Sequence, residues 1–319
     1  MKARATVSPP KPESNMPIGR SITVAQATRD YSDASGTHVS FVAVLTATLL
    51  ALTAAVLHAA WNLAVKQTVH ERFVALWAQF IFGGLFAVVG LVVAGGMTAQ
   101  GWIWAVLSGC VHLPYLILLA RAYGHGDFSQ VYPIARGGGA FLSAIGGIVL
   151  LNDPAKAWTI AAIAIIAVGL GLLAGRWRGP AVLTAIGVAT TICAYTLFDS
   201  KGSRSTDKVG YAFASGMMTA TTASIYGIAT HRVTRLRAAL RADWKRFALA
   251  GFASLLTYTL VLIAVRYASV GYVTALRESS VVLAALIGWR MLGEGDVRRR
   301  VSASGVVLSG LVLLVTLGR

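Results

Sequence analysis

The sequence predicts an all-α membrane protein with ten transmembrane helices, arranged as two inverted five-helix repeats. Of its 319 residues, 56% are apolar and only 13% are charged, whereas a soluble domain carries roughly 25% charged residues. The apolar residues also gather in runs of about 17–25, the length that crosses a hydrocarbon core of roughly 30 Å as a helix. A third observation, an internal repeat, predicts the division into two halves.

The first 40 residues differ from the rest of the chain. Residues 1–40 are polar, contain several prolines and show no apolar period, so we expect a disordered tail. Apolar runs then follow one another to the end of the chain. We place the spans near 41–65, 73–94, 102–121, 128–151, 157–175, 180–199, 209–230, 247–266, 270–290 and 301–317. Helices are expected because backbone groups in lipid need partners within their own segment, and no barrel-like alternation is present.

An internal repeat relates the first five spans to the last five. Residues 131–173, moved forward by 141 positions, meet residues 272–314 without a gap, and Arg136 then falls on Arg277. A matched arginine is informative because charge inside a span is rare. Since each half has an odd number of spans, the second half is predicted to be inverted relative to the first. The predicted halves are residues 41–176 and 177–319.

The charge of the chain is strongly positive. A net charge of +16 is common in nucleic-acid-binding proteins. Here, however, the Lys and Arg residues lie mostly in the tail and in short gaps between apolar runs, where basic residues orient membrane proteins. We therefore expect the lipid bilayer as a partner and no nucleic acid. The gaps, above all residues 231–246 and Arg298–Arg300, would place both termini outside, whereas the basic tail favours the opposite orientation.

Charged residues inside the predicted spans indicate a binding site. Arg136 and Arg277 lie in the first halves of the fourth and ninth spans, and their equivalence predicts that both face a central cavity between the halves. The alternative is that both arginines snorkel to the headgroups. Glu278 follows Arg277 directly and points about 100° away from it on a helix. Glu278 is expected to neutralise an arginine of another span, to accept a proton during transport, or to form a purely structural ion pair.

The end of the first span carries a polar stripe. His58, Asn62 and Lys66 are spaced four residues apart in HAAWNLAVK, which places them on one face of a helix. We interpret this stripe as facing the cavity; the alternative is that Trp61 and Lys66 are interfacial anchors. The predicted substrate-binding residues are His58, Trp61, Asn62, Lys66, Tyr132, Arg136, Arg277 and Glu278.

Motifs of other functional classes are missing from the sequence. Cys110 and Cys193 lie in apolar runs without metal-ligand spacing, and we find no nucleotide loop, catalytic triad spacing or HExxH. We therefore expect no catalytic residue, no metal site and no cofactor, and we predict that the protein is not an enzyme. Without an ATPase motif, any driving force must come from a gradient of a solute, an ion or protons.

Three stretches of the chain resemble the EamA-type transporters of the drug/metabolite transporter superfamily. They are HAAWNLAVK (58–66), LARAYGHGDFSQVYPIARG (119–137) and VRYASVGYVTALRESSVVLAALIGWRMLGE (265–294). The resemblance covers about residues 41–317. It implies a multi-pass protein of a bacterial inner membrane, with a central cavity between two inverted halves and alternating access.

The leading functional hypothesis is a secondary active transporter, an exporter of a small polar metabolite such as an amino acid or organic anion. A cavity holding Arg136, Arg277 and Lys66 against Glu278 and Asp199 has a positive surplus, which favours an anionic or zwitterionic solute. An alternative is a flippase or carrier for a lipid-linked or sugar-type substrate. A scaffold or sensor that transports nothing is a third possibility, but it would not need matched arginines in two spans.

Overall fold

The computed structural model describes residues 37–66, 69–125, 128–154, 156–174, 180–206, 209–280, 282 and 297–317. Within these ranges the chain forms helices and no strand. The helices are α2 (Thr37–Lys66), α3 (Arg72–Val93), α4 (Ala99–His125), α5 (Phe128–Leu151), α6 (Ala157–Ala174), α7 (Pro180–Arg204), α8 (Gly210–Ala229), α9 (Val233–Ala264), α10 (Val270–Arg277) and α12 (Val297–Leu317). Most of the predicted tail therefore lies outside the described residues.

Six of the described helices are long and apolar enough to cross a membrane, and two further apolar helices, Ala157–Leu172 and Ser302–Leu317, are shorter. The ninth predicted span can be followed as a helix through α10, but most of its second half lies outside the described ranges. The all-helical, multi-pass architecture is thus confirmed. The number of ten spans stays a prediction.

Large apolar side chains cover the outside of the bundle. On α3, for example, Leu85, Val89 and Val93 are 58%, 62% and 82% exposed. The buried face of α3 carries large residues in its first turns, Trp77 among them, and only small ones further on, among them Gly83 and Ala87. Small residues let helix backbones approach closely where no hydrophobic effect separates helix from lipid. This distribution suits a protein whose outer surface contacts acyl chains.

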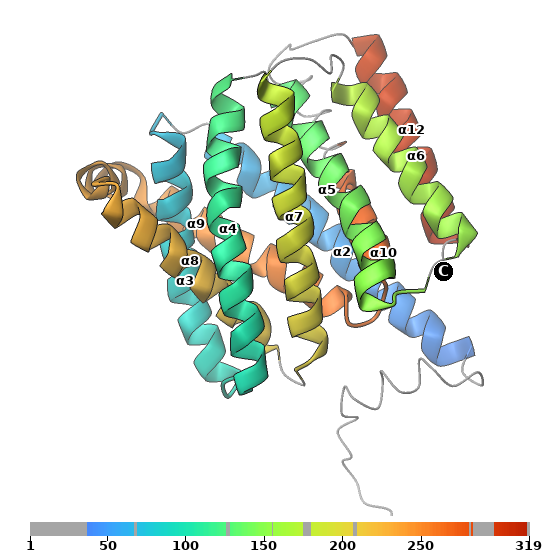
Figure 1. Cartoon of the computed structure of the whole chain (residues 1–319), viewed down its shortest axis with the longest axis horizontal. Coiled ribbons are helices and arrows are strands. Elements are labelled where there is room, and N and C mark those ends of the chain that lie inside the picture. Colours follow the sequence, from blue (N-terminus) through green and yellow to red (C-terminus); the bar gives the residue numbers. More distant parts are fainter. Residues whose placement is uncertain are drawn as a thin grey trace, which may run out of the picture.

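The helices pack mainly between the two predicted halves. Helix α2 packs against α9, and α4 packs against α7; α3 lies against α8 and α9, and α5 lies against α7. Helices α6 and α12 pair at one edge of the bundle, and α10 crosses behind α5 (Figure 1). Each half therefore buries its apolar helix faces largely against the other.

The contact between α6 and α12 is reciprocal. A Cβ on Gly169 would meet Val307 at 2.7 Å, and a Cβ on Gly310 would meet Ile166 at the same distance. The shift of 141 positions that places Gly169 on Gly310 also places Ile166 on Val307. Gly169 of α6 thus lies against Val307 of α12, and their equivalents, Gly310 of α12 and Ile166 of α6, lie against each other in the same way. Such reciprocal contacts are found at an interface around a two-fold axis.

Residues 231–246, predicted as a gap, are helical in the structure from Val233 onward. Helix α9 begins with these basic turns and kinks at Asp243 (φ −134°) before its apolar part. The turns are helical because Leu236 and Ala239, one turn apart, are buried against the bundle. That spacing was visible in the sequence and indicates an amphipathic helix.

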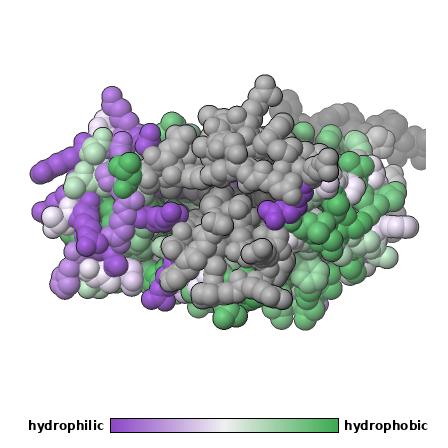
Figure 2. Space-filling model, turned by 90° about the horizontal axis from the view of Figure 1, so that it is seen from above, coloured by the Kyte–Doolittle hydropathy of each residue, from purple (hydrophilic) through white to green (hydrophobic). Residues whose placement is uncertain are grey.

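The basic turns of α9 are held to the loop before α3. Arg232 Nε and Arg235 Nη1 donate to the Glu71 carboxylate at 3.0 and 2.6 Å. Partial burial raises the pKa of Glu71, but the two guanidinium groups outweigh it and hold the pKa below its usual value. Viewed from above, hydrophilic residues gather on the side where α3, α8 and α9 lie (Figure 2). This end of the bundle is therefore charged, as expected at a membrane surface.

We expect Gly251→Ala to destabilise the protein by about 1–3 kcal/mol, the usual effect of overpacking. A Cβ at Gly251 would lie 2.5 Å from the Gln79 backbone oxygen and 2.8 Å from the Gly83 nitrogen, so α3 and α9 would have to separate. Gly305→Ala is the control, because no atom of a neighbouring described residue lies within 4 Å of its Cβ position. Thermal unfolding in detergent should show a lower midpoint for the first variant only. Equal midpoints would mean that the two helices do not cross here.

Candidate functional site

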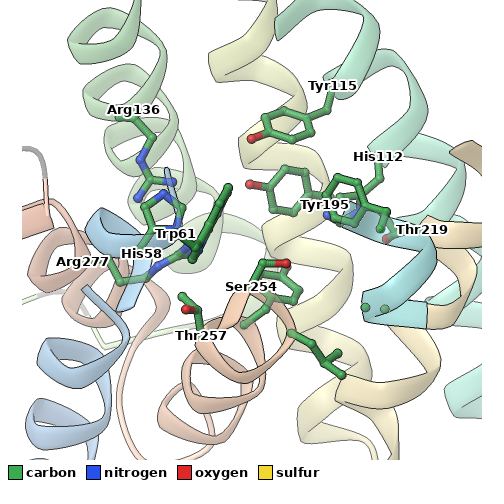
Figure 3. Close-up of a pocket in the computed structure, with 15 residues that line it drawn as sticks. His58, Trp61, His112, Tyr115, Arg136, Tyr195, Thr219, Ser254, Thr257 and Arg277 are labelled. Carbon is green, nitrogen blue, oxygen red and sulfur yellow. The ribbon is translucent and has the colours of Figure 1, made fainter. Parts of the chain in front are cut away.

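A cavity of about 90 Å³ lies in the middle of the bundle. It is bounded by α2, α3, α4, α5, α7, α8, α9 and α10, so both predicted halves contribute to its wall. Its lining residues are His58, Trp61, Phe80, Gly83, His112, Tyr115, Arg136, Tyr195, Gly216, Thr219, Ser254, Leu255, Thr257, Tyr258 and Arg277. In the close-up, Arg136, His58, Trp61 and Arg277 face Tyr115, Tyr195 and His112 across the cavity (Figure 3).

Both matched arginines line this cavity. Arg136 in α5 is 7% exposed and Arg277, the last residue of α10, is 6% exposed, so neither snorkels to a headgroup. Arg136 Nη2 donates to Glu278 Oε1 at 2.9 Å. Glu278 therefore neutralises an arginine of another helix, which was one of the three roles expected for it. The Glu278 side chain does not line the cavity itself.

Arg277 differs from Arg136 in its partners. Its guanidinium is buried at the cavity wall, yet no carboxylate lies within 4.0 Å of it in the part of the chain that the structure describes. Its Nε atom is also buried without a hydrogen-bond partner among those residues. A buried charge without a counter-charge is costly. Arg277 is thus prepared to receive an anionic group that enters the cavity.

A polar link between the halves positions α10 and hence Arg277. Asp153, just after α5, accepts the backbone N–H of Val270 at 2.7 Å through Oδ2. A carboxylate at this place satisfies a free donor at the helix N-terminus and complements its partial positive charge. Arg204 of α7 holds Asp153 at 2.6 Å and also donates from Nε to the Val265 oxygen at 2.8 Å. The start of α10 is therefore fixed by α7 and by the end of α5.

Of the predicted stripe on α2, two residues can be placed. His58 and Trp61 line the cavity, with ring centroids 4.9 Å apart in an edge-to-face arrangement. The Trp61 Nε1 atom is buried without a hydrogen-bond partner among the described residues. The side chains of Asn62, Lys66 and Tyr132 lie outside the described residues.

The wall opposite the arginines is aromatic. His112 stacks on Tyr195 with centroids 4.1 Å apart, and Tyr115 packs edge-on against Tyr195 at 5.4 Å. Tyr258 packs against the same ring at 6.2 Å. His112 Nδ1 donates to the Ser108 backbone oxygen at 2.9 Å, since a carbonyl oxygen can only accept. The Nε2 atom of neutral His112 is therefore an acceptor.

Threonine hydroxyl groups form part of the remaining wall. Thr219 and Thr257 donate their hydroxyl protons to the backbone oxygens of Ser215 and Ala253, at 3.0 and 2.6 Å. Their oxygen lone pairs remain able to accept a hydrogen bond from a ligand. The cavity thus combines a cationic wall, an aromatic wall and neutral acceptors. Such a site suits a small solute with an anionic group, an apolar body and, in a zwitterion, an ammonium group.

The aromatic wall was not among the predicted site residues. His112 and Tyr115 were visible as a polar i, i+3 pair in an apolar span, and Tyr195 stands four residues before Asp199. Either spacing indicates one helix face. Tyrosines, however, also occur as interfacial anchors, and nothing in the sequence shows that α4, α7 and α9 converge. Within the described residues, no group of three His, Cys, Asp or Glu could hold a metal ion.

Comparisons with known proteins agree with this architecture. The model of the EamA-like transporter family matches residues 179–316, the second predicted half. No curated protein matches the chain. Among solved structures, 29 chains match. One, a crystal structure, covers 84% of this chain and 95% of its own with a TM-score of 0.65 and 16% identity, which shows a shared fold and nothing more.

Proposed function

We propose that this chain is a secondary active exporter of a small organic anion or amino acid and that it belongs to the drug/metabolite transporter superfamily, as the EamA-like match over residues 179–316 supports. The apolar helices and the EamA-like match support a multi-pass membrane transporter. The solute class, the export direction and a bacterial inner membrane are parts of the proposal, as is the absence of catalysis.

One observation carries the proposed solute class. Arg277 is a buried cation at the cavity wall without a carboxylate partner in the described part of the chain. A guanidinium presents a planar fork that binds a carboxylate through two hydrogen bonds. Binding an anion would therefore remove the electrostatic cost of the empty site. A neutral sugar would leave that cost in place, which argues against the sugar-type alternative.

The size and the opposite wall of the cavity support the same class. A volume of about 90 Å³ suits a small metabolite better than the large head group of a lipid-linked substrate. Tyr115 and Tyr195 offer aromatic surface to an apolar side chain, and Thr219 and Thr257 offer acceptors to an ammonium group. An amino acid or an amphipathic organic acid would satisfy all three walls at once.

We extend the proposal to alternating access between two inverted halves, residues 41–176 and 177–319. The reciprocal packing of Gly169 and Gly310 supports a two-fold relation between them. The shared cavity position of Arg136 and Arg277, 141 residues apart, supports it as well. In an inverted repeat the substrate lies near the middle of the membrane between the halves, where rocking of one half on the other exposes it to either side.

An untargeted comparison of metabolites inside and outside cells tests the proposed function. Cells that produce the protein should accumulate an organic anion or amino acid outside, relative to cells without it. Cells with Arg277→Ala should resemble cells without the protein, whereas the exposed Arg237→Ala should behave like the wild type. Export of only metabolites that lack an anionic group, unaffected by Arg277→Ala, would contradict the proposal.

A further inference from the structure

Three carboxyl groups in the described part of the chain are buried, and one of them has no cationic partner. Asp153 is paired with Arg204, and Glu278 is paired with Arg136. Asp199 in α7 is 0% exposed, and no Lys, Arg or His nitrogen of the described residues lies within 4.0 Å of it. An ionised carboxylate inside a membrane span without a counter-charge is expensive and therefore indicates a function.

Hydroxyl groups from two neighbouring helices surround Asp199. Oδ1 accepts hydrogen bonds from Tyr211 Oη at 2.7 Å and from Ser215 Oγ at 3.0 Å, both on α8. Oδ2 accepts a hydrogen bond from Tyr258 Oη on α9. A hydroxyl can donate to a carboxylate and can equally accept from a carboxylic acid. These partners can therefore satisfy Asp199 in both protonation states, whereas an arginine partner would favour only the charged state.

Asp199 is connected to the central cavity through Tyr258. The Tyr258 side chain lines the cavity, and its hydroxyl contacts Asp199, so one phenol group joins the buried carboxyl to the solute site. His112 lines the same stretch of wall, 6.1 Å from the Tyr258 ring between centroids. The shift that relates Arg136 to Arg277 also places His58, another cavity residue, on Asp199.

The elements packed on α7 bring few competing charges to this region. The titratable or charged groups near it are His112 and Tyr115 on α4, Arg136 on α5, Tyr211 on α8, Tyr258 on α9 and Tyr195 on α7 itself, and Arg277 of α10 shares the cavity wall with Tyr195 and Tyr258. Arg136 is engaged with Glu278, and the tyrosines are neutral in the physiological pH range. Asp199 is thus the carboxyl group of this set, and no cation of the described residues pairs with it.

We propose that Asp199 is a reversible proton-binding site, which takes up and releases its proton through the Tyr258 hydroxyl at the cavity wall. When a proton arrives from the cavity, the Tyr258 oxygen accepts it and passes its own phenolic proton to Asp199 Oδ2. Tyr258 stays neutral, and the net change is one O–H bond formed on Asp199. Together with the proposed transport function, the site would let a proton gradient drive the solute.

Infrared spectroscopy of the purified full chain in lipid vesicles tests this site without any solute. Lowering the pH from about 8 to about 5, the range of physiological switches, should produce the carbonyl band of a protonated carboxyl in an apolar setting. Asp199→Asn should lose this band. The double variant Arg136→Ala, Glu278→Gln, which removes another buried carboxyl together with its counter-charge, should keep it. The proposal is overturned if the wild type and Asp199→Asn give the same pH difference spectrum.

Two milder variants keep the test decisive if Asp199→Asn does not fold. Ser215→Ala removes one hydrogen bond to Oδ1 and should change the pH dependence of the band. Tyr258→Phe removes the hydrogen bond to Oδ2 and should shift the position of the band. An unchanged band in both variants would show that it does not arise from Asp199. Because no solute is involved, failure here would leave the proposed anion transport standing, and failure at Arg277 would leave the proton site standing.

Discussion

Arg277→Ala is expected to abolish transport of the anionic solute without loss of folding. Truncating one side of a buried charge pair costs about 2–5 kcal/mol, which corresponds to a loss of roughly 30-fold or more in transport efficiency. Arg277→Lys should also transport poorly although it keeps the charge, because an ammonium group cannot form the two-point contact of a guanidinium. Flux of the solute found in the metabolite comparison, measured in proteoliposomes, gives the result.

The stability of the Arg277→Ala variant separates a functional from a structural role. Arg277 has no carboxylate partner among the described residues, so its removal leaves no opposite charge exposed in the core. We therefore expect a thermal midpoint equal to or above that of the wild type, since an uncompensated buried charge disappears. A folded, monodisperse variant that still transports at the wild-type rate would remove Arg277 from the binding site.

Arg136→Ala is expected to destabilise the protein strongly, by about 3–5 kcal/mol, because it leaves Glu278 buried without its counter-charge. The two side chains are only 8% and 3% exposed, and Glu278 Oε2 is buried without any hydrogen-bond partner among the described residues. The double variant Arg136→Ala, Glu278→Gln should regain much of that stability, since neither charge remains. A thermal double-mutant cycle in detergent measures this coupling.

Additive effects in that cycle would show that Arg136 and Glu278 do not interact in the folded protein. The cycle also informs the transport proposal. If Arg136 serves chiefly to neutralise Glu278, the stable double variant should retain part of its transport. The matched arginines would then have divided their roles, with Arg136 holding the helices together and Arg277 binding the solute.

The sequence alone predicted the fold class because composition and run length reflect the solvent of the chain directly. It also predicted that Arg136 and Arg277 meet at one cavity, because the repeat relates them and an arginine inside a span seldom faces lipid. The fold class depends on the average composition of segments, and the cavity prediction depends on two single positions. Both can be read directly from a sequence. The basic turns of α9 were missed because their charge dominates a composition average, although the spacing of Leu236 and Ala239 reveals the buried face.

The rest of the site depends on which helix faces meet, and one sequence does not show this. Glu278 was predicted among the substrate residues, but its pairing with Arg136 on another helix places it behind the cavity wall. The aromatic wall brings His112, Tyr195 and Tyr258 together from three helices far apart in the chain. The partners of Asp199 likewise come from α8 and α9. Such convergence is a property of helix packing.

The interface between α6 and α12 has two equivalent sides. Its contacts are therefore kept when each half of the protein adopts the conformation that the other half had before. If access alternates by such an exchange, the packing of Gly169 and Gly310 contributes almost equally to the inward-open and outward-open states. The free-energy difference between those states then arises where the halves differ chemically, as at Glu278, which the shift of 141 pairs with Gly137, and at Asp199, which it pairs with His58. A ligand shifts an equilibrium only by its differential affinity for the two states, and a small intrinsic difference lets modest binding energies do so. Because α6 and α12 are nearly symmetric, the side of the membrane to which the cavity opens would then depend mainly on the binding of the solute and of the proton.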